Sequence, residues 1–233
     1  MNSYIYIVII IIFAIYIFNL KKEPFQSNIK FCVIVTTYNP GVYFLEKCLK
    51  SIENQIYKNY DVCILDDASN KDEIKTKDLI KEYCKKNNWK YVFKKDNIGP
   101  LGGRIGAIEK LDPDDETVIV SIDGDDELYD NHVFTLLNNY YTNDDIWITF
   151  GNYVDQYPDK KISKPKIKCK GFKFNKITEN NMFRKTQWIY SHLKTFKYKL
   201  YKRISHHDLK KNGKYIKSAT DMACLLYTSP SPR

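Results

Sequence analysis

Between residues 31 and 150 the chain alternates short apolar runs with segments whose apolar residues recur every three or four positions. The runs at residues 31–37 (FCVIVTT), 60–65 (YDVCIL) and 117–122 (TVIVSI) are apolar on both faces and rich in β-branched residues, which is typical of buried parallel strands. Shorter runs at residues 91–93 and 146–150 predict two further strands.

The intervening segments predict helices. Apolar residues with helical spacing indicate a helix over residues 43–56, and similar patterns favour helices over residues 72–86 and 131–141. The glycine-bearing segment 97–104 predicts a loop that leads into a helix ending near Lys110, and helical character returns at about residues 185–202. Strands that alternate with helices predict an α/β fold with a mostly parallel sheet, flanking helices and right-handed crossovers.

The N-terminus differs from this pattern. Residues 4–18 form an unbroken apolar run that is followed by Lys21 and Lys22. No basic segment precedes the run and no small-residue cleavage site follows it, which argues against a removable signal peptide. We therefore expect residues 1–22 to be a single-pass membrane anchor, a buried core helix being the alternative. The positive-inside rule predicts that the following domain is cytosolic, with a lumenal orientation as the alternative.

Composition limits the function classes. With 43% hydrophobic and 15% aromatic residues the chain can build a core, which argues against wholesale disorder. The net charge of +9 arises from 37 basic and 28 acidic residues, and lysines are densest over residues 160–217. A solvated lysine surface is the simplest interpretation, and a face toward anionic lipids is the alternative. No nucleic-acid partner is expected, because no helix-turn-helix, zinc-finger or RNA-binding signature is present.

The six cysteines include no C-x-x-C pair, so neither a zinc site nor a disulfide framework is predicted.

Polar residues follow the predicted strands where those strands end. In an open parallel sheet, ligands bind beyond the carboxyl ends of the strands. The turn after the first predicted strand contains neither a dinucleotide-binding fingerprint nor a P-loop. An EF-hand loop that began at Asp123 would need glycine at its sixth position, where this chain has Leu128. The pattern therefore predicts a nucleotide-and-metal site of another kind. The residues at these strand ends are Thr36, Tyr38, Asn39, Asp66, Asp67, Asp123, Asp125 and Asp126.

The segment VIVTTYNPGVYFLEKCLKSIENQIYKNYDVCILDDAS, followed by the D-x-D stretch DGDD, resembles the opening half of family 2 glycosyltransferases. The resemblance covers about residues 31–150 and implies the GT-A fold, a nucleotide-diphosphate sugar donor, with uridine as the favoured nucleoside, and an acceptor that is a glycan, a lipid or a protein. It also implies that Thr36 and Tyr38 contact the base and that Asp67 accepts the N3–H of the base.

For the D-x-D aspartates, the resemblance implies ribose contact by Asp123 and coordination of a divalent cation by Asp123 and Asp125. Oxygen ligands of this kind suit Mn²⁺ or Mg²⁺, and Asp126 is a further candidate ligand. Arg104 has the geometry to bind a phosphate as a fork, although a surface salt bridge is an equally good interpretation.

An inverting transfer needs a base for the acceptor hydroxyl. The resemblance implies an aspartate late in the domain near a helix N-terminus, and Asp221 fits, although a plain helix cap would also favour aspartate there. His192 either lines the acceptor side, binds the metal or is simply packed. A non-catalytic module that binds a nucleotide sugar is the alternative function.

These expectations divide the chain into five parts. They are an anchor (1–22), a linker (23–30), a nucleotide-sugar-binding half (31–150), an acceptor-side half that is expected to be truncated (151–226) and a tail that is expected to be non-native (227–233).

Overall fold

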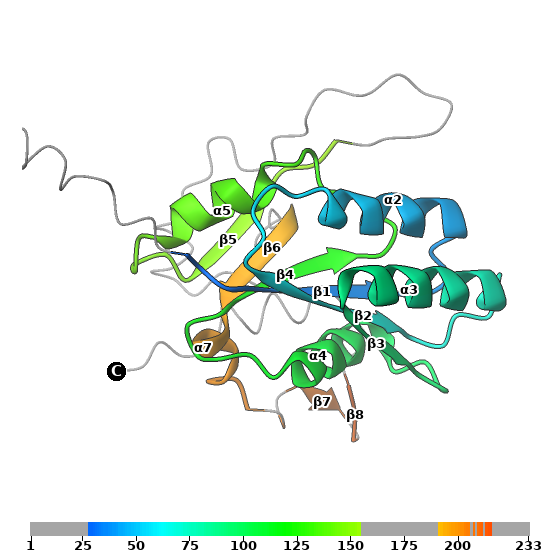
Figure 1. Cartoon of the computed structure of the whole chain (residues 1–233). Coiled ribbons are helices and arrows are strands. Elements are labelled where there is room, and N and C mark those ends of the chain that lie inside the picture. Colours follow the sequence, from blue (N-terminus) through cyan, green and yellow to red (C-terminus); the bar gives the residue numbers. More distant parts are fainter. Residues whose placement is uncertain (1–27, 155–190, 206, 208, 212, 216–233) are drawn as a thin grey trace, which may run out of the picture.

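The computed structural model describes residues 28–154, 191–205, 207, 209–211 and 213–215 (Figure 1). Its main feature is a six-stranded sheet in the order β3-β2-β1-β4-β6-β5. These strands are β1 (Phe31–Thr37), β2 (Tyr60–Asp66), β3 (Lys90–Phe93), β4 (Val118–Asp123), β5 (Ile148–Gly151) and β6 (Ser191–Lys197). The helices are α2 (Val42–Glu53), α3 (Glu73–Asn87), α4 (Gly99–Leu111), α5 (Val133–Tyr141) and α7 (Tyr198–Tyr201), and β7 (Lys210–Lys211) and β8 (Lys214–Tyr215) form a small antiparallel pair.

The sheet is mixed. The neighbours β3, β2, β1 and β4 are parallel, as predicted, whereas β6 runs antiparallel to both β4 and β5. All seven residues of β1 are buried, which explains its continuous apolar sequence. The predicted α/β class is therefore confirmed, with one antiparallel strand near its edge.

Helices cover both faces of this sheet (Figure 1). Alternate residues of β1 belong to two apolar clusters: Val33 packs with the side chains of α2, α3 and α5, and Ile34 packs with those of α4 and α7. Since successive side chains of a strand point to opposite faces, this division follows directly from the sequence of β1. The result is a three-layer α/β/α arrangement whose central strands end at one common edge.

The glycine segment before residue 104 is helical, so the prediction of a loop there is wrong. Helix α4 begins at Gly99 and has Pro100 in its first turn, where proline is favoured. A Cβ built at Gly103 would lie 3.4 Å from Thr36 and Leu65, so the helix can pack close to β1 and β2. The glycines therefore allow close helix–sheet packing, and the loop is confined to the residues before Gly99.

The prediction of helical structure over residues 185–202 is wrong for its described part. Residues 191–197 form β6, and only the short helix α7 follows. Phe196 and Thr195 are buried on opposite faces of this strand, against the side chains of α7 and α5 respectively. Pairing with two neighbouring strands decides the structure here, because tertiary context readily outweighs local helix propensity.

Among the residues that the structure describes, no helix has the length and apolar character needed to cross a bilayer. The expected anchor at residues 1–22 lies outside them.

Candidate functional site

The carboxyl ends of β1, β2 and β4 meet at one edge of the sheet. The parallel register places Thr37 beside Asp66 and Thr36 beside Asp123. The polar residues that follow the three strands are thus neighbours in space, although they are up to about 90 positions apart in the chain. The structure brings together three of the predicted residues here: Thr36, Arg104 and Asp123.

Arg104, on α4, contacts Asp123 at the carboxyl end of β4. Its Nη2 donates to Oδ1 of Asp123, and its Nε donates to the hydroxyl of Ser121 at 3.0 Å. Thr36 also directs its hydroxyl toward Oδ1 of Asp123, at 3.5 Å. Because Arg104 is only 3% exposed, the interpretation of it as a surface salt bridge is wrong. The contacts hold one oxygen of Asp123 and leave the other oxygen, Oδ2, directed toward β6.

A candidate cation site lies on this other side of Asp123. Asp123, Asp126 and His192 each offer a ligand atom, and these atoms lie within 4.8 Å of one another. His192 Nδ1 is 3.4 Å from Asp126 Oδ2, and His192 Nε2 is 4.0 Å from Asp123 Oδ2. Two carboxylates and an imidazole suit Mn²⁺ better than Mg²⁺, which prefers oxygen ligands alone. The donor set therefore fits one of the two predicted cations especially well.

The turn from Asp123 to Asp126 depends on Gly124. Its N–H donates to the carbonyl of Thr36 at 2.8 Å, and a Cβ at this position would lie 2.7 Å from Cβ of Thr37. The N–H of Asp126 then donates to the carbonyl of Asp123 at 3.0 Å. This tight turn brings the carboxyl groups of Asp123 and Asp126 together, whereas Asp125 is exposed and does not belong to the cluster formed by the described side chains.

The electrostatics of this turn favour a bound cation. Burial raises the pKa of the Asp126 carboxyl, the nearby His192 opposes that shift, and the negative charges of Asp123 and Asp125 add to it. A divalent cation between the carboxylates would remove most of this repulsion.

Asp67 and Tyr38 lie farther along the same edge. Asp67 is buried, and its two carboxylate oxygens accept the backbone N–H groups of Ile98 and Gly99, each at 2.8 Å. It thus caps the start of α4, a structural role that the sequence analysis did not anticipate. A carboxylate has further lone pairs, so a bond to a base remains chemically feasible. Tyr38 is 52% exposed and is available to a ligand.

Two polar residues near Asp123 were missed by the sequence analysis. Ser121 interrupts the apolar run of β4 two residues before Asp123, which was a usable signal. Lys194 of β6 lies directly opposite Ser121, but its position could not be foreseen because a helix was expected there. The predicted base, Asp221, lies outside the described residues.

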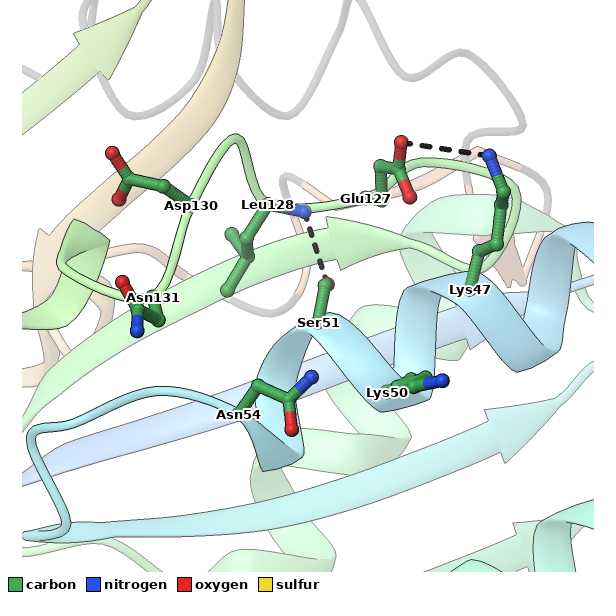
Figure 2. A pocket seen from close by; sticks show the side chains of 8 residues that line it. All are labelled: Lys47, Lys50, Ser51, Asn54, Glu127, Leu128, Asp130 and Asn131. Carbon is green, nitrogen blue, oxygen red and sulfur yellow. Dashed lines mark hydrogen bonds and ion pairs between the residues drawn. The ribbon is translucent and has the colours of Figure 1, made fainter.

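A surface pocket lies next to this site, between α2 and the loop that follows Asp126 (Figure 2). In this pocket the Leu128 N–H donates to the Ser51 hydroxyl at 3.0 Å, and Lys47 pairs with Glu127 at 3.8 Å. These two contacts hold the loop against α2. None of the predicted site residues lines the pocket. The pocket is lined by Lys47, Lys50, Ser51, Asn54, Glu127, Leu128, Asp130 and Asn131.

Curated relatives match the first part of the chain. A glucosyltransferase of Campylobacter jejuni, named GalNAc(5)-diNAcBac-PP-undecaprenol beta-1,3-glucosyltransferase, is 31% identical over 125 residues, covering 53% of this chain and 38% of that protein. An uncharacterized glycosyltransferase of Rickettsia bellii is 31% identical over 113 residues, covering 48% of this chain and 15% of that protein. The chain thus spans well under half of the length of either relative.

Solved structures share the fold. TarS of S. aureus in complex with UDP-GlcNAc superposes with a TM-score of 0.60 at 19% identity, covering 86% of this chain and 53% of that one. A mannosyltransferase from Pyrobaculum calidifontis in complex with GDP-Man and Mn²⁺ gives a TM-score of 0.54 at 16% identity, covering 82% and 54%. The predicted GT-A type of fold is thereby confirmed. The model of the glycosyl transferase family 2 matches residues 32–205, which is more than half of the chain, and the chain belongs to this family.

Proposed function

We propose that this chain is the donor-binding part of a glycosyltransferase that moves a sugar from a uridine diphosphate sugar to an acceptor hydroxyl, with a divalent cation and with inversion at the sugar. The observation that carries the proposal is the group Asp123, Asp126 and His192, held at the carboxyl edge of the sheet by the buried Arg104. A carboxylate-and-imidazole cluster beside a fixed guanidinium suits a diphosphate that arrives together with its cation.

Each residue at the edge has a distinct part in this proposal. Thr36, Tyr38 and Asp67 bind the nucleoside, and Asp123 reaches the ribose and the cation. Asp126 and His192 complete the cation site, to which Asp125 contributes from the exposed side of the turn. A cation bound there neutralises negative charge that develops on the departing diphosphate. Arg104 keeps Asp123 oriented and adds a permanent positive charge next to the phosphates.

For the acceptor we propose a lipid-linked glycan. The C. jejuni relative carries in its name a glycan on undecaprenyl diphosphate. An N-terminal anchor at residues 1–22 would hold the site near such a membrane-bound substrate, with the domain on the cytosolic side. Asp221 is the proposed base that accepts the proton of the acceptor hydroxyl.

Nucleotide binding is tested by thermal unfolding of the full chain in detergent. UDP with Mn²⁺ at about 100 times Kd should stabilise the fold by about 2.7 kcal/mol. For a domain of this size that corresponds to a rise of roughly 5–10 °C in Tm. The rise should vanish when EDTA replaces Mn²⁺. An unchanged Tm at millimolar UDP with Mn²⁺ would contradict the proposed function, and a larger rise with GDP would reassign the base.

A further inference from the structure

Asn39 connects the two turns that carry the proposed base contacts. It directly follows Tyr38 in the turn after β1, and its side chain reaches the turn after β2. There its amide oxygen Oδ1 accepts the backbone N–H groups of Asn70 and Lys71, at 2.9 Å and 2.8 Å. These bonds join residues that are 31 and 32 positions apart in the chain. The second turn is the one that carries Asp67, so a single side chain links the surroundings of both base contacts.

A second series of bonds joins the same two turns. The backbone N–H of Asn39 donates to Oγ of Ser69 at 2.8 Å. The Ser69 hydroxyl donates to Oδ1 of Asp66, and the Ser69 N–H donates to Oδ2 of the same carboxylate at 3.2 Å. Asp66 and Ser69 are both buried, so water competes little for these bonds. The series ends at Asp66, which is the residue immediately before Asp67.

The backbone of both turns depends on such support. Asn39 and Ala68 are left-handed, with φ of 51° and 64°. Asparagine tolerates this region of backbone conformation, whereas alanine is found there rarely. A strained backbone persists only where the surrounding contacts fix it. Each of the two left-handed residues directly follows a proposed base contact, Tyr38 or Asp67, so the contacts that fix these turns also fix the directions of those two side chains.

The two base contacts are held to different degrees. The N–H of Asp67 donates to the carbonyl of Thr37 at 2.8 Å, and its carboxylate caps α4. The side chain of Tyr38 lies on the surface and is about half exposed. The position of Tyr38 relative to Asp67 therefore depends strongly on the bonds that its neighbour Asn39 makes across the two turns.

We propose that Asn39 is a positioning residue for nucleoside binding, which fixes Tyr38 relative to Asp67 before the ligand arrives. The inference rests on the proposed function, in which these two residues contact the base. A site whose contacts are already in place loses less conformational entropy on binding. Removal of the link should therefore weaken binding of the nucleoside although no contact to the ligand has been deleted.

The alternative is that Asn39 only stabilises the fold. A residue of that kind changes Tm and leaves the affinity of the folded protein for its ligands unchanged. General loosening of the sheet edge would instead weaken every ligand that binds there. A positioning role is distinguished from both, because it weakens UDP and leaves Mn²⁺ binding at the separate group of Asp123, Asp126 and His192 unaffected.

Three variants separate these roles. Asn39→Gly removes Oδ1 and keeps both the backbone N–H and a left-handed conformation, which glycine adopts readily. Asn39→Asp keeps an acceptor oxygen and should restore the link. Asn88→Gly is the matched control, because Asn88 is also a left-handed asparagine, with φ of 56°. It is exposed at the end of α3, before the amino end of β3 and therefore at the edge of the sheet opposite the site.

The experiment uses the full chain in detergent, after Tm has shown that each variant is folded. Kd for UDP with Mn²⁺ is measured by calorimetry, and Kd for Mn²⁺ alone by electron paramagnetic resonance. Asn39→Gly should raise Kd for UDP roughly 10-fold, as expected when two neutral hydrogen bonds no longer order the site, and leave Kd for Mn²⁺ unchanged. Asn39→Asp should stay close to the parent, and Asn88→Gly should not differ from it.

Three results would overturn this inference and leave the proposed function intact. They are an unchanged UDP affinity of Asn39→Gly, equal losses of affinity for UDP and for Mn²⁺, and an Asn39→Asp variant that binds UDP as weakly as Asn39→Gly. If Asn39→Gly does not fold, the same comparison is made with Asn39→Ser, whose hydroxyl is too short to accept both N–H groups. A parent chain that fails to bind UDP would overturn the proposed function and this inference with it.

Discussion

Asp126→Asn is expected to weaken the Mn²⁺-dependent binding of UDP roughly 100-fold, since even residues that only support a metal ligand change metal affinity 10- to 100-fold. The substitution keeps the shape of the side chain and removes the charge that the cation needs. It should also remove the cost of burying a charge and the repulsion by Asp123 and Asp125, which together raise the pKa of Asp126, so the fold itself should not be weakened. The loss is read from UDP titrations with and without Mn²⁺.

Two matched variants make this result specific. Asp130→Asn lies on the same loop, and an asparagine oxygen can still accept the His132 N–H that Asp130 accepts at 2.8 Å. It should bind UDP like the parent. Asp125→Asn tests the ligand that the D-x-D pattern predicts, and we expect a smaller loss than for Asp126→Asn because Asp125 is exposed. A larger loss for Asp125→Asn would mean that the cation binds at Asp123 and Asp125, as the motif alone suggests.

The second large effect is expected for Asp221→Asn. If Asp221 is the base, its amide variant should bind UDP and Mn²⁺ like the parent and transfer sugar more slowly by a factor on the order of 10²–10⁴. The reason is geometric. An inverting displacement needs a base on the face of the sugar opposite the diphosphate, and the aspartates around Gly124 lie on the diphosphate side. Transfer is measured with radiolabelled UDP-sugars and lipid-linked glycan acceptors.

Asp78→Asn is the control for that measurement, because Asp78 lies on α3 with its side chain 66% exposed. Transfer by Asp221→Asn at the parent rate would show that the base is elsewhere. Retention of the α-configuration of the donor in the product would contradict inversion. UDP binding without any transfer by the parent would favour the non-catalytic module.

Much of the fold was predictable from the sequence because it depends on local patterns. The runs of β1, β2 and β4 are apolar on both faces, and such runs have few alternatives to a strand covered on both sides. The polar residues at their ends were then necessarily neighbours, since parallel strands in register end at one edge. Thr36 and Asp123 were found in this way.

The remaining features depend on contacts between distant segments. Gly99 begins a helix because Asp67, 32 residues earlier, accepts its N–H. Residues 191–197 form a strand because they pair with β4 on one side and with β5 on the other. Lys194 comes to lie opposite Ser121 only through that pairing, so no pattern within its own segment could indicate its position. For the same reason the sequence left several roles open for His192, whereas the structure places it within 4.8 Å of the carboxylates of Asp123 and Asp126.

We propose that UDP and a divalent cation bind together at the edge formed by the carboxyl ends of β1, β2 and β4. Anomalous diffraction from crystals of the chain grown with UDP and Mn²⁺ tests it most directly. We expect one strong manganese peak beside Asp123, Asp126 and His192, with the phosphates of UDP near Arg104. A UDP–Mn²⁺ complex located away from Asp123, or UDP bound at this edge without a manganese peak, would contradict it.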